Sequence, residues 1–176
     1  MIWITAERRD IMRAIEAIHS RVSVRKYKDE IVGKELLLTL VDAGRRAPSA
    51  RAVEPWEFVV IQDTETLSRL SEITSPNGSF IADAAASIIV LSSETKYYLE
   101  DSVAATENIL IAAADAGLGA CWIAGDKKDY CPEIINLLKA PADLRLVSII
   151  SIGWPAQENV QSKKRALEQV IHWERY

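Results

Sequence analysis

Two arginines and a serine alternate with valines in the segment SRVSVRKY, residues 20–27. In an extended chain successive side chains point to opposite sides, so Arg21, Ser23 and Arg25 share one face and Val22 and Val24 take the other. Guanidinium groups bind phosphate through paired hydrogen bonds, and a hydroxyl adds a further donor. The pattern therefore predicts a small phosphate-binding site, with a solvated edge segment as the alternative interpretation.

Near the C-terminus, Lys163, Lys164 and Arg165 form a second basic cluster in a chain whose formal net charge is -4. This cluster could add cations to a phosphate site, or it could be an ordinary exposed loop. The acidic balance, without any long run of Lys or Arg, argues against a nucleic-acid-binding protein, which needs a concentrated basic surface.

Small side chains fill the connection APSARAVEPW, residues 47–56. Ala47, Ser49, Ala50 and Ala52 would let a flat ring approach the backbone closely, and backbone N–H groups could then bind its polar edge. This loop is a candidate binding surface for a planar cofactor.

Several standard chemistries lack their residues. There is no GxSxG motif, and His19 and His172 are too few for a histidine metal site or an evident catalytic triad. Cys121 and Cys131 stand ten residues apart without a CxxC pair, which favours buried or incidental thiols. The stretch GLGACW follows a helical segment and lacks the third glycine of a dinucleotide fingerprint. A binding site is thus better supported than a side-chain nucleophile.

The hydrophobic periodicity predicts a single domain over residues 1–176 that mixes helices and strands. The 49% hydrophobic and 26% charged composition is typical of a soluble globular protein. The N-terminus resembles no signal peptide, and Asp115 interrupts the longest apolar segment, so we expect a cytoplasmic protein without a membrane span. The tail from Ala166 fits either a helix or an extended arm. Helices are expected over 7–19, 35–46, 64–73, 101–116 and 132–139, and strands over 57–61, 87–92, 120–124 and 145–153.

Five motifs occur in the order seen in the FMN-dependent nitroreductase family, and the chain resembles that family from about residue 11 to about residue 173. They are SRVSVRKY, APSARAVEPWEFVV, AAADAGLGACWIAG, SIGWP and the late KKR. The resemblance implies an α+β sandwich, with a mainly antiparallel central sheet flanked by helices. It also implies an intertwined homodimer with FMN at the subunit interface, and we expect the alanine-rich face of residues 104–116 to pack there.

The resemblance also assigns roles to individual residues. Arg21, Ser23 and Arg25 would hold the phosphate and ribityl end of FMN, and the partner subunit would contribute the small loop. Backbone N–H groups at the end of the strand over 120–124 would face flavin N5. The remaining implied cofactor contacts are Lys163 and Arg165 at the phosphate, Pro48, Ser49 and Ala50 in the loop, and Ala124 and Gly125 at N5.

Two positions depart from the family pattern. Ala52 and Glu54 stand where family members commonly have Asn and Gln. These changes remove or alter amide contacts at the ring edge and so bear on substrate choice.

The activity implied is that of an FMN-dependent oxidoreductase. NADH or NADPH would reduce the flavin, and the reduced flavin would pass electrons by a ping-pong mechanism to a small electron-poor acceptor such as a nitroaromatic or a quinone. Two alternatives stay open at this stage. One is an FMN-binding sensor or carrier without reductase turnover, and the other is specialised family chemistry such as reductive dehalogenation or flavin fragmentation.

Overall fold

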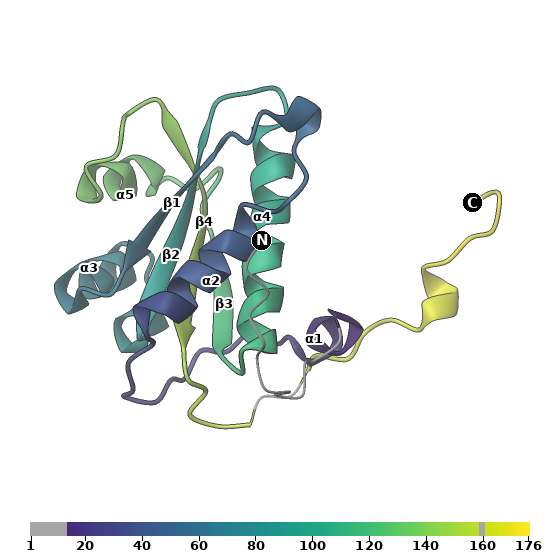
Figure 1. Cartoon of the computed structure of the whole chain (residues 1–176), viewed down its shortest axis with the longest axis horizontal. Coiled ribbons are helices and arrows are strands. Elements are labelled where there is room, and N and C mark those ends of the chain that lie inside the picture. Colours follow the sequence, from purple (N-terminus) through teal and green to yellow (C-terminus); the bar gives the residue numbers. More distant parts are fainter. Residues whose placement is uncertain (1–13, 159–160) are drawn as a thin grey trace, which may run out of the picture.

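The computed structural model describes residues 14–158 and 161–176, which fold around a four-stranded sheet (Figure 1). The strands are β1 (Trp56–Ile61), β2 (Ala86–Ser93), β3 (Gly119–Ala124) and β4 (Leu144–Gly153). Their order is β1-β2-β4-β3, and all three neighbouring pairs are antiparallel. With helices on both faces of this sheet, the expected α+β class is confirmed.

The helices divide into two layers. Helices α2 (Lys34–Gly44) and α4 (Tyr98–Asp115) pack with the core on one face, and α3 (Thr64–Ile73) and α5 (Cys131–Leu137) pack with the core on the other. Helix α1 (Ala14–Ser20) contacts α4. Two short 3₁₀ turns, η1 (Ala50–Ala52) and η2 (Ser79–Asp83), lie in the connections that lead to β1 and β2.

The two central strands explain why both faces of the sheet are covered. In β2, Ile88 and Val90 enter the core beside α2 and α4, whereas Ile89 and Leu91 enter the core beside α3 and α5. All four side chains are at most 1% exposed. Because successive strand residues point to opposite faces, an unbroken apolar run fits only a strand buried on both sides.

Most expected elements are confirmed, with shifts at their ends. The expected helix over 64–73 matches α3, which begins where Asp63 accepts a hydrogen bond from the Thr66 N–H at 2.8 Å. The helix expected to run through Lys139 ends at Leu137, because Lys139 adopts a left-handed φ of 52°. The part of the first expected helix before Ala14 lies outside the described residues.

Helix α4 is buried within its own chain more completely than expected. Ala105, Ile109 and Ala113 have no exposed surface, and α4 approaches α2 so closely that a Cβ on Gly44 would lie 2.9 Å from Ile109. Ala113 therefore belongs to the core of the chain itself. Ala114 is only partly buried.

The C-terminal segment 161–176 is an extended arm that leaves the body of the domain (Figure 1). Its regular structure is the single 3₁₀ turn η3 (Leu167–Gln169). The arm carries large apolar side chains in the open, with Leu167 64% and Trp173 80% exposed. Of the two structures considered for the tail, the extended arm is confirmed.

Candidate functional site

The segment with alternating arginines crosses the beginning of β3. Ser23 forms a parallel bridge with Ala120, and the Val24 N–H donates to the Ala120 carbonyl at 3.0 Å. Val24 is 3% exposed, whereas Ser23 and Arg25 lie on the surface. Gly119 allows this packing, since a Cβ there would lie 2.7 Å from the Val24 Cβ. The predicted alternation is thus present, with the polar face open to solvent.

This polar face forms one wall of a cavity of about 320 Å³. The opposite wall comes from the C-terminal segment, which Gln161 fixes in place by donating to the His19 carbonyl at 2.6 Å and the Arg21 carbonyl at 3.3 Å. Segments about 140 residues apart therefore meet at one site. The lining residues are Arg21, Val22, Ser23, Arg25, Gln161, Ser162 and Lys164.

The late basic cluster contributes a different residue from those expected. Lys164 lines the cavity, whereas Lys163 and Arg165 are exposed and are absent from its lining. The Arg165 guanidinium donates instead to the Gln169 carbonyl at 3.4 Å. In an extended chain successive side chains point to opposite sides. Lys164 therefore faces the cavity, and its neighbours Lys163 and Arg165 point away from it.

The charges around the cavity are mostly positive. Arg21 Nε lies 3.6 Å from a carboxylate oxygen of Glu107, and the Arg25 guanidinium lies 5.6 Å from the centre of the Phe80 ring. Burial raises the pKa of the Cys121 thiol beneath, while the charges of Arg25 and Arg21 and a hydrogen bond with Ser23 oppose that rise. Two guanidiniums and one ammonium outweigh the single carboxylate in charge. Together with the Ser23 hydroxyl, these cations form the donor set that a phosphate requires.

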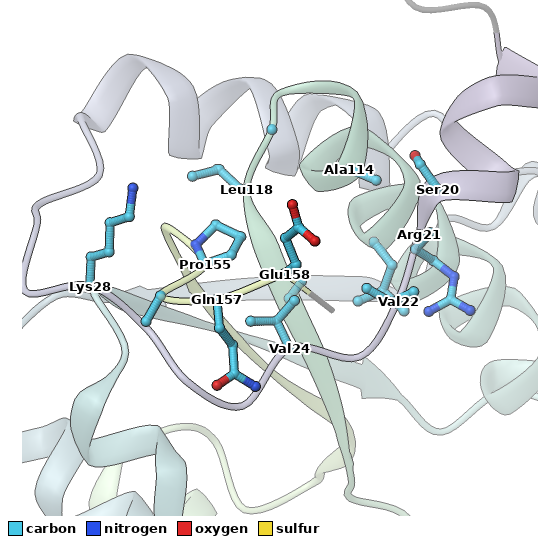
Figure 2. A pocket seen from close by; sticks show the side chains of 14 residues that line it. Ser20, Arg21, Val22, Val24, Lys28, Ala114, Leu118, Pro155, Gln157 and Glu158 are labelled. Carbon is cyan, nitrogen blue, oxygen red and sulfur yellow. The ribbon is translucent and has the colours of Figure 1, made fainter. Parts of the chain in front are cut away.

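A larger hollow of about 530 Å³ lies beside Arg21, and Figure 2 shows Arg21 at one end, Lys28 at the other and Glu158 between them. Apolar side chains, among them Val24, Leu110 and Leu118, form most of its wall. The carboxylate in its middle makes this hollow a poorer phosphate site than the smaller cavity.

The exposed edge of β3 leads away from the cavity. In an antiparallel ladder every second residue bonds the neighbouring strand, and the residues between turn their backbone groups outward. Gly125 N–H donates to the Val147 carbonyl of β4 at 3.2 Å, and the Ala120 carbonyl accepts from Val24 on the outer side. By this alternation Ala124, four residues beyond Ala120, directs its N–H to the free edge.

The two backbone donors predicted for flavin N5 are therefore not equivalent. The Gly125 N–H is engaged within the sheet, and the Ala124 N–H faces outward beside the Tyr130 hydroxyl, which donates to the Ala124 carbonyl. A strand advances about 3.3 Å per residue, so Ala124 lies roughly 13 Å along the edge from Ala120. An elongated ligand with an anionic end at Arg21 could reach Ala124.

The small loop forms the turn η1 at the other end of α4. Ser49 and Ala50 are half-buried, and Pro48, Ala52 and Glu54 are exposed. Ala50 bonds Asp101 in the first turn of α4, whereas Arg21 contacts Glu107 and shares its hollow with Leu110 and Ala114. At 1.5 Å per residue these contacts lie roughly 9–20 Å apart along the helix. The loop and the cavity beside Arg21 therefore occupy separate places in one chain.

Sequence reasoning missed Asp101 as a contributor to this region. Its side chain is 7% exposed, and its Oδ1 accepts the Ala50 N–H at 3.0 Å. The available signal was a carboxylate at the start of a helix that is apolar almost all round.

Within residues 14–158 and 161–176, no cluster of three or more His, Cys, Asp or Glu side chains could hold a metal ion. In the same part of the chain, no helix is long and apolar enough to cross a membrane.

Comparison with known proteins identifies relatives over almost the whole chain. Residues 18–78 and 74–154 match the model of the Nitroreductase family. A Methanothermobacter thermautotrophicus protein, named provisionally as an NADH dehydrogenase/NAD(P)H nitroreductase, is 34% identical over 171 residues, covering 94% of this chain and 88% of the relative.

Two solved structures share the fold. A protein from Parabacteroides distasonis with the same provisional name superimposes with a TM-score of 0.87 at 32% identity, covering 93% of this chain and 98% of that one. An FMN-dependent nitroreductase from Clostridium difficile gives a TM-score of 0.85 at 31% identity, covering 92% and 99% of the two chains.

Proposed function

This chain belongs to the nitroreductase family, and we propose that it is an FMN-dependent NAD(P)H oxidoreductase that reduces a small electron-poor acceptor, such as a nitroaromatic or a quinone. The observation that carries the proposal is the cavity in which Arg21, Ser23, Arg25 and Lys164 converge. Its donors suit the phosphate of FMN, and the β3 edge leads from there to an outward backbone N–H at Ala124.

The roles of the chain's residues follow from this geometry. Arg21, Ser23 and Arg25 would bind the phosphate and ribityl end, with Lys164 completing the site and Lys163 and Arg165 adding positive potential nearby. Ala124 would donate its N–H at the ring, and Gly125 would hold the turn against β4. When bound, FMN supplies reversible hydride transfer between NAD(P)H and the acceptor. The protein's own contribution is to bind and orient, and a ping-pong order fits a single open face for both substrates.

A homodimer completes the site in this proposal. The loop with Pro48, Ser49 and Ala50, and with Ala52 and Glu54 at its end, lies roughly 9–20 Å along α4 from the contacts of Arg21, so a second copy would bring it to the cofactor. The extended arm supports the same assembly, because exposed side chains such as Trp173 gain stability by burial against a partner. Light scattering should give twice the chain mass, and a flavin-loaded monomer would contradict this assembly.

The decisive experiment is an absorption spectrum of the purified protein before and after anaerobic NADH or NADPH. We expect the spectrum of bound FMN, bleached by the reductant and restored by an acceptor such as menadione or nitrofurazone. A protein that stays colourless after incubation with FMN would refute the cofactor. Bound FMN that neither nicotinamide reduces would refute the reductase activity and leave a flavin-binding protein.

A further inference from the structure

The loop that follows α2 holds an unfavourable backbone conformation. Arg51, Ala52 and Glu54 have φ values of 59°, 54° and 49°, in the left-handed region that side chains with a Cβ rarely occupy. Such a conformation persists only where surrounding contacts over-determine it. The loop therefore needs contacts that hold it in this shape.

Some of these contacts lie inside the loop. Ser49 Oγ accepts the Glu54 N–H at 3.0 Å, and the Ser49 carbonyl accepts the Ala52 N–H at 3.1 Å. These bonds define the curvature of the turn. They do not fix the position of the turn relative to the rest of the domain.

Asp101 supplies the link to the body of the domain. Its side chain is 7% exposed, and its Oδ1 accepts the Ala50 N–H at 3.0 Å, so a buried carboxylate bonds a loop amide. A hydrogen bond to an ionised acceptor is stronger than a neutral one, and removing a buried partner costs more than the bond itself contributes. Asp101 also lies on α4, an 18-residue helix with a buried face that includes Ala105 and Ile109.

We propose that Asp101 is a positioning residue, which holds the strained loop 49–54 in the conformation that packs against the flavin ring. This inference rests on the proposed function, since the loop would contact a flavin ring only if the protein binds FMN. If the loop is competent for binding only a fraction of the time, the apparent dissociation constant rises by the inverse of that fraction. Because the loop would touch the ring and not the phosphate, FMN and riboflavin should be affected alike.

The test compares Asp101→Leu, which keeps the approximate volume and removes the acceptor, with Asp101→Asn, which keeps an oxygen for the Ala50 N–H. Glu100→Leu is the matched control, because Glu100 is an exposed acidic residue in the same first turn of α4. Each variant would be titrated with FMN and with riboflavin, and its folded fraction would be measured by circular dichroism.

We expect Asp101→Leu to raise both dissociation constants about tenfold, which corresponds to 1.4 kcal/mol. Asp101→Asn should raise them about threefold, and Glu100→Leu should leave them unchanged. Unchanged affinities in folded Asp101→Leu, or a loss confined to FMN, would overturn the proposal. If Asp101→Leu does not fold, Asp101→Asn becomes the test of the proposal. Wild-type flavin affinities in Asp101→Asn, together with an unchanged flavin spectrum and an unchanged rate of reduction by NADH, would then overturn the proposal. Failure of the wild-type protein to bind either flavin would instead refute the proposed function.

Discussion

Replacing Arg21 by alanine tests the phosphate site most directly. Arg21 lines the cavity with Ser23, Arg25 and Lys164, and its side chain is 26% exposed. If its guanidinium binds the FMN phosphate, the substitution should weaken FMN and leave riboflavin unaffected, since riboflavin has the same ring and no phosphate.

The size of the effect follows from the surroundings of Arg21. One charge-assisted hydrogen bond contributes about 1.5–3 kcal/mol, so the dissociation constant for FMN should rise roughly tenfold to hundredfold. Arg21 also pairs with Glu107, whose side chain is 45% exposed. A solvent-exposed pair of this kind contributes about 0–1 kcal/mol to folding, so the variant should stay folded. With Arg21 removed, the Glu107 carboxylate would lose its cationic partner and repel the phosphate, which places the expected loss toward the upper end.

The assay is a pair of fluorescence titrations with FMN and riboflavin. Arg25→Lys serves as a second variant and should also weaken FMN, because a point charge cannot reproduce a two-pronged contact. Glu107→Gln is the converse control and should strengthen FMN binding or leave it unchanged. Parallel losses of FMN and riboflavin affinity in Arg21→Ala would show that the arginine supports the fold and does not bind the phosphate.

Further predictions address the neighbouring features. Lys164→Ala should weaken FMN more than Lys163→Ala does, because only Lys164 of the two lines the cavity; equal losses in titrations would contradict this geometry. Gly125→Ala should lower the free energy of unfolding by about 1–3 kcal/mol in urea, since its Cβ would lie 2.7 Å from the Val147 carbonyl oxygen. Gly33→Ala, with no atom within 4 Å of the new Cβ, is the control, and a similar loss there would refute the explanation. A chain that ends at Arg165 should be monomeric in light scattering, and a stable dimer would show that the arm is dispensable. The Thr66 hydroxyl and N–H hold the pKa of Asp63 below its ordinary value of 3.8. This carboxylate should therefore stabilise the wild type relative to Asp63→Asn near neutral pH, and the advantage should vanish as the pH falls through that lowered pKa; urea unfolding at pH 7 and pH 3 measures it.

The elements that sequence reasoning located best have both a periodic pattern and a local boundary signal. Helix α3 follows the Asp63 cap, and α4 ends before Gly117, whose φ of 72° suits a helix terminus. The end of α5 lacks such a signal, because Lys139 occupies the left-handed position where a glycine would have marked it. Local chemistry thus determines how far a boundary can be predicted.

The parts of the site that could not be predicted depend on contacts between distant segments. The Gln161 side chain bonds the backbone carbonyls of His19 and Arg21, and this contact fixes the position of the C-terminal segment along residues 19–21. Lys164 faces the cavity as a result. The choice between Ala124 and Gly125 as an outward donor depends on how β3 pairs with β4, and one strand's sequence does not contain that pairing. The residue types at the site could be predicted, but the alignment of the segments that carry them could not.

The outward backbone of β3 has a consequence for genetic screens of this protein. Ala120 and Ala124 would contribute main-chain atoms, and both positions already carry alanine, so a scan that converts each residue to alanine passes over them without a change. A screen of that kind would recover the arginines and miss the strand edge on which the ring would depend. Replacing single amide bonds by esters, through protein semisynthesis, removes one N–H while the side chain stays the same. An ester at residue 124 should impair flavin reduction, whereas an ester at residue 125 should chiefly loosen the sheet, because that N–H bonds Val147.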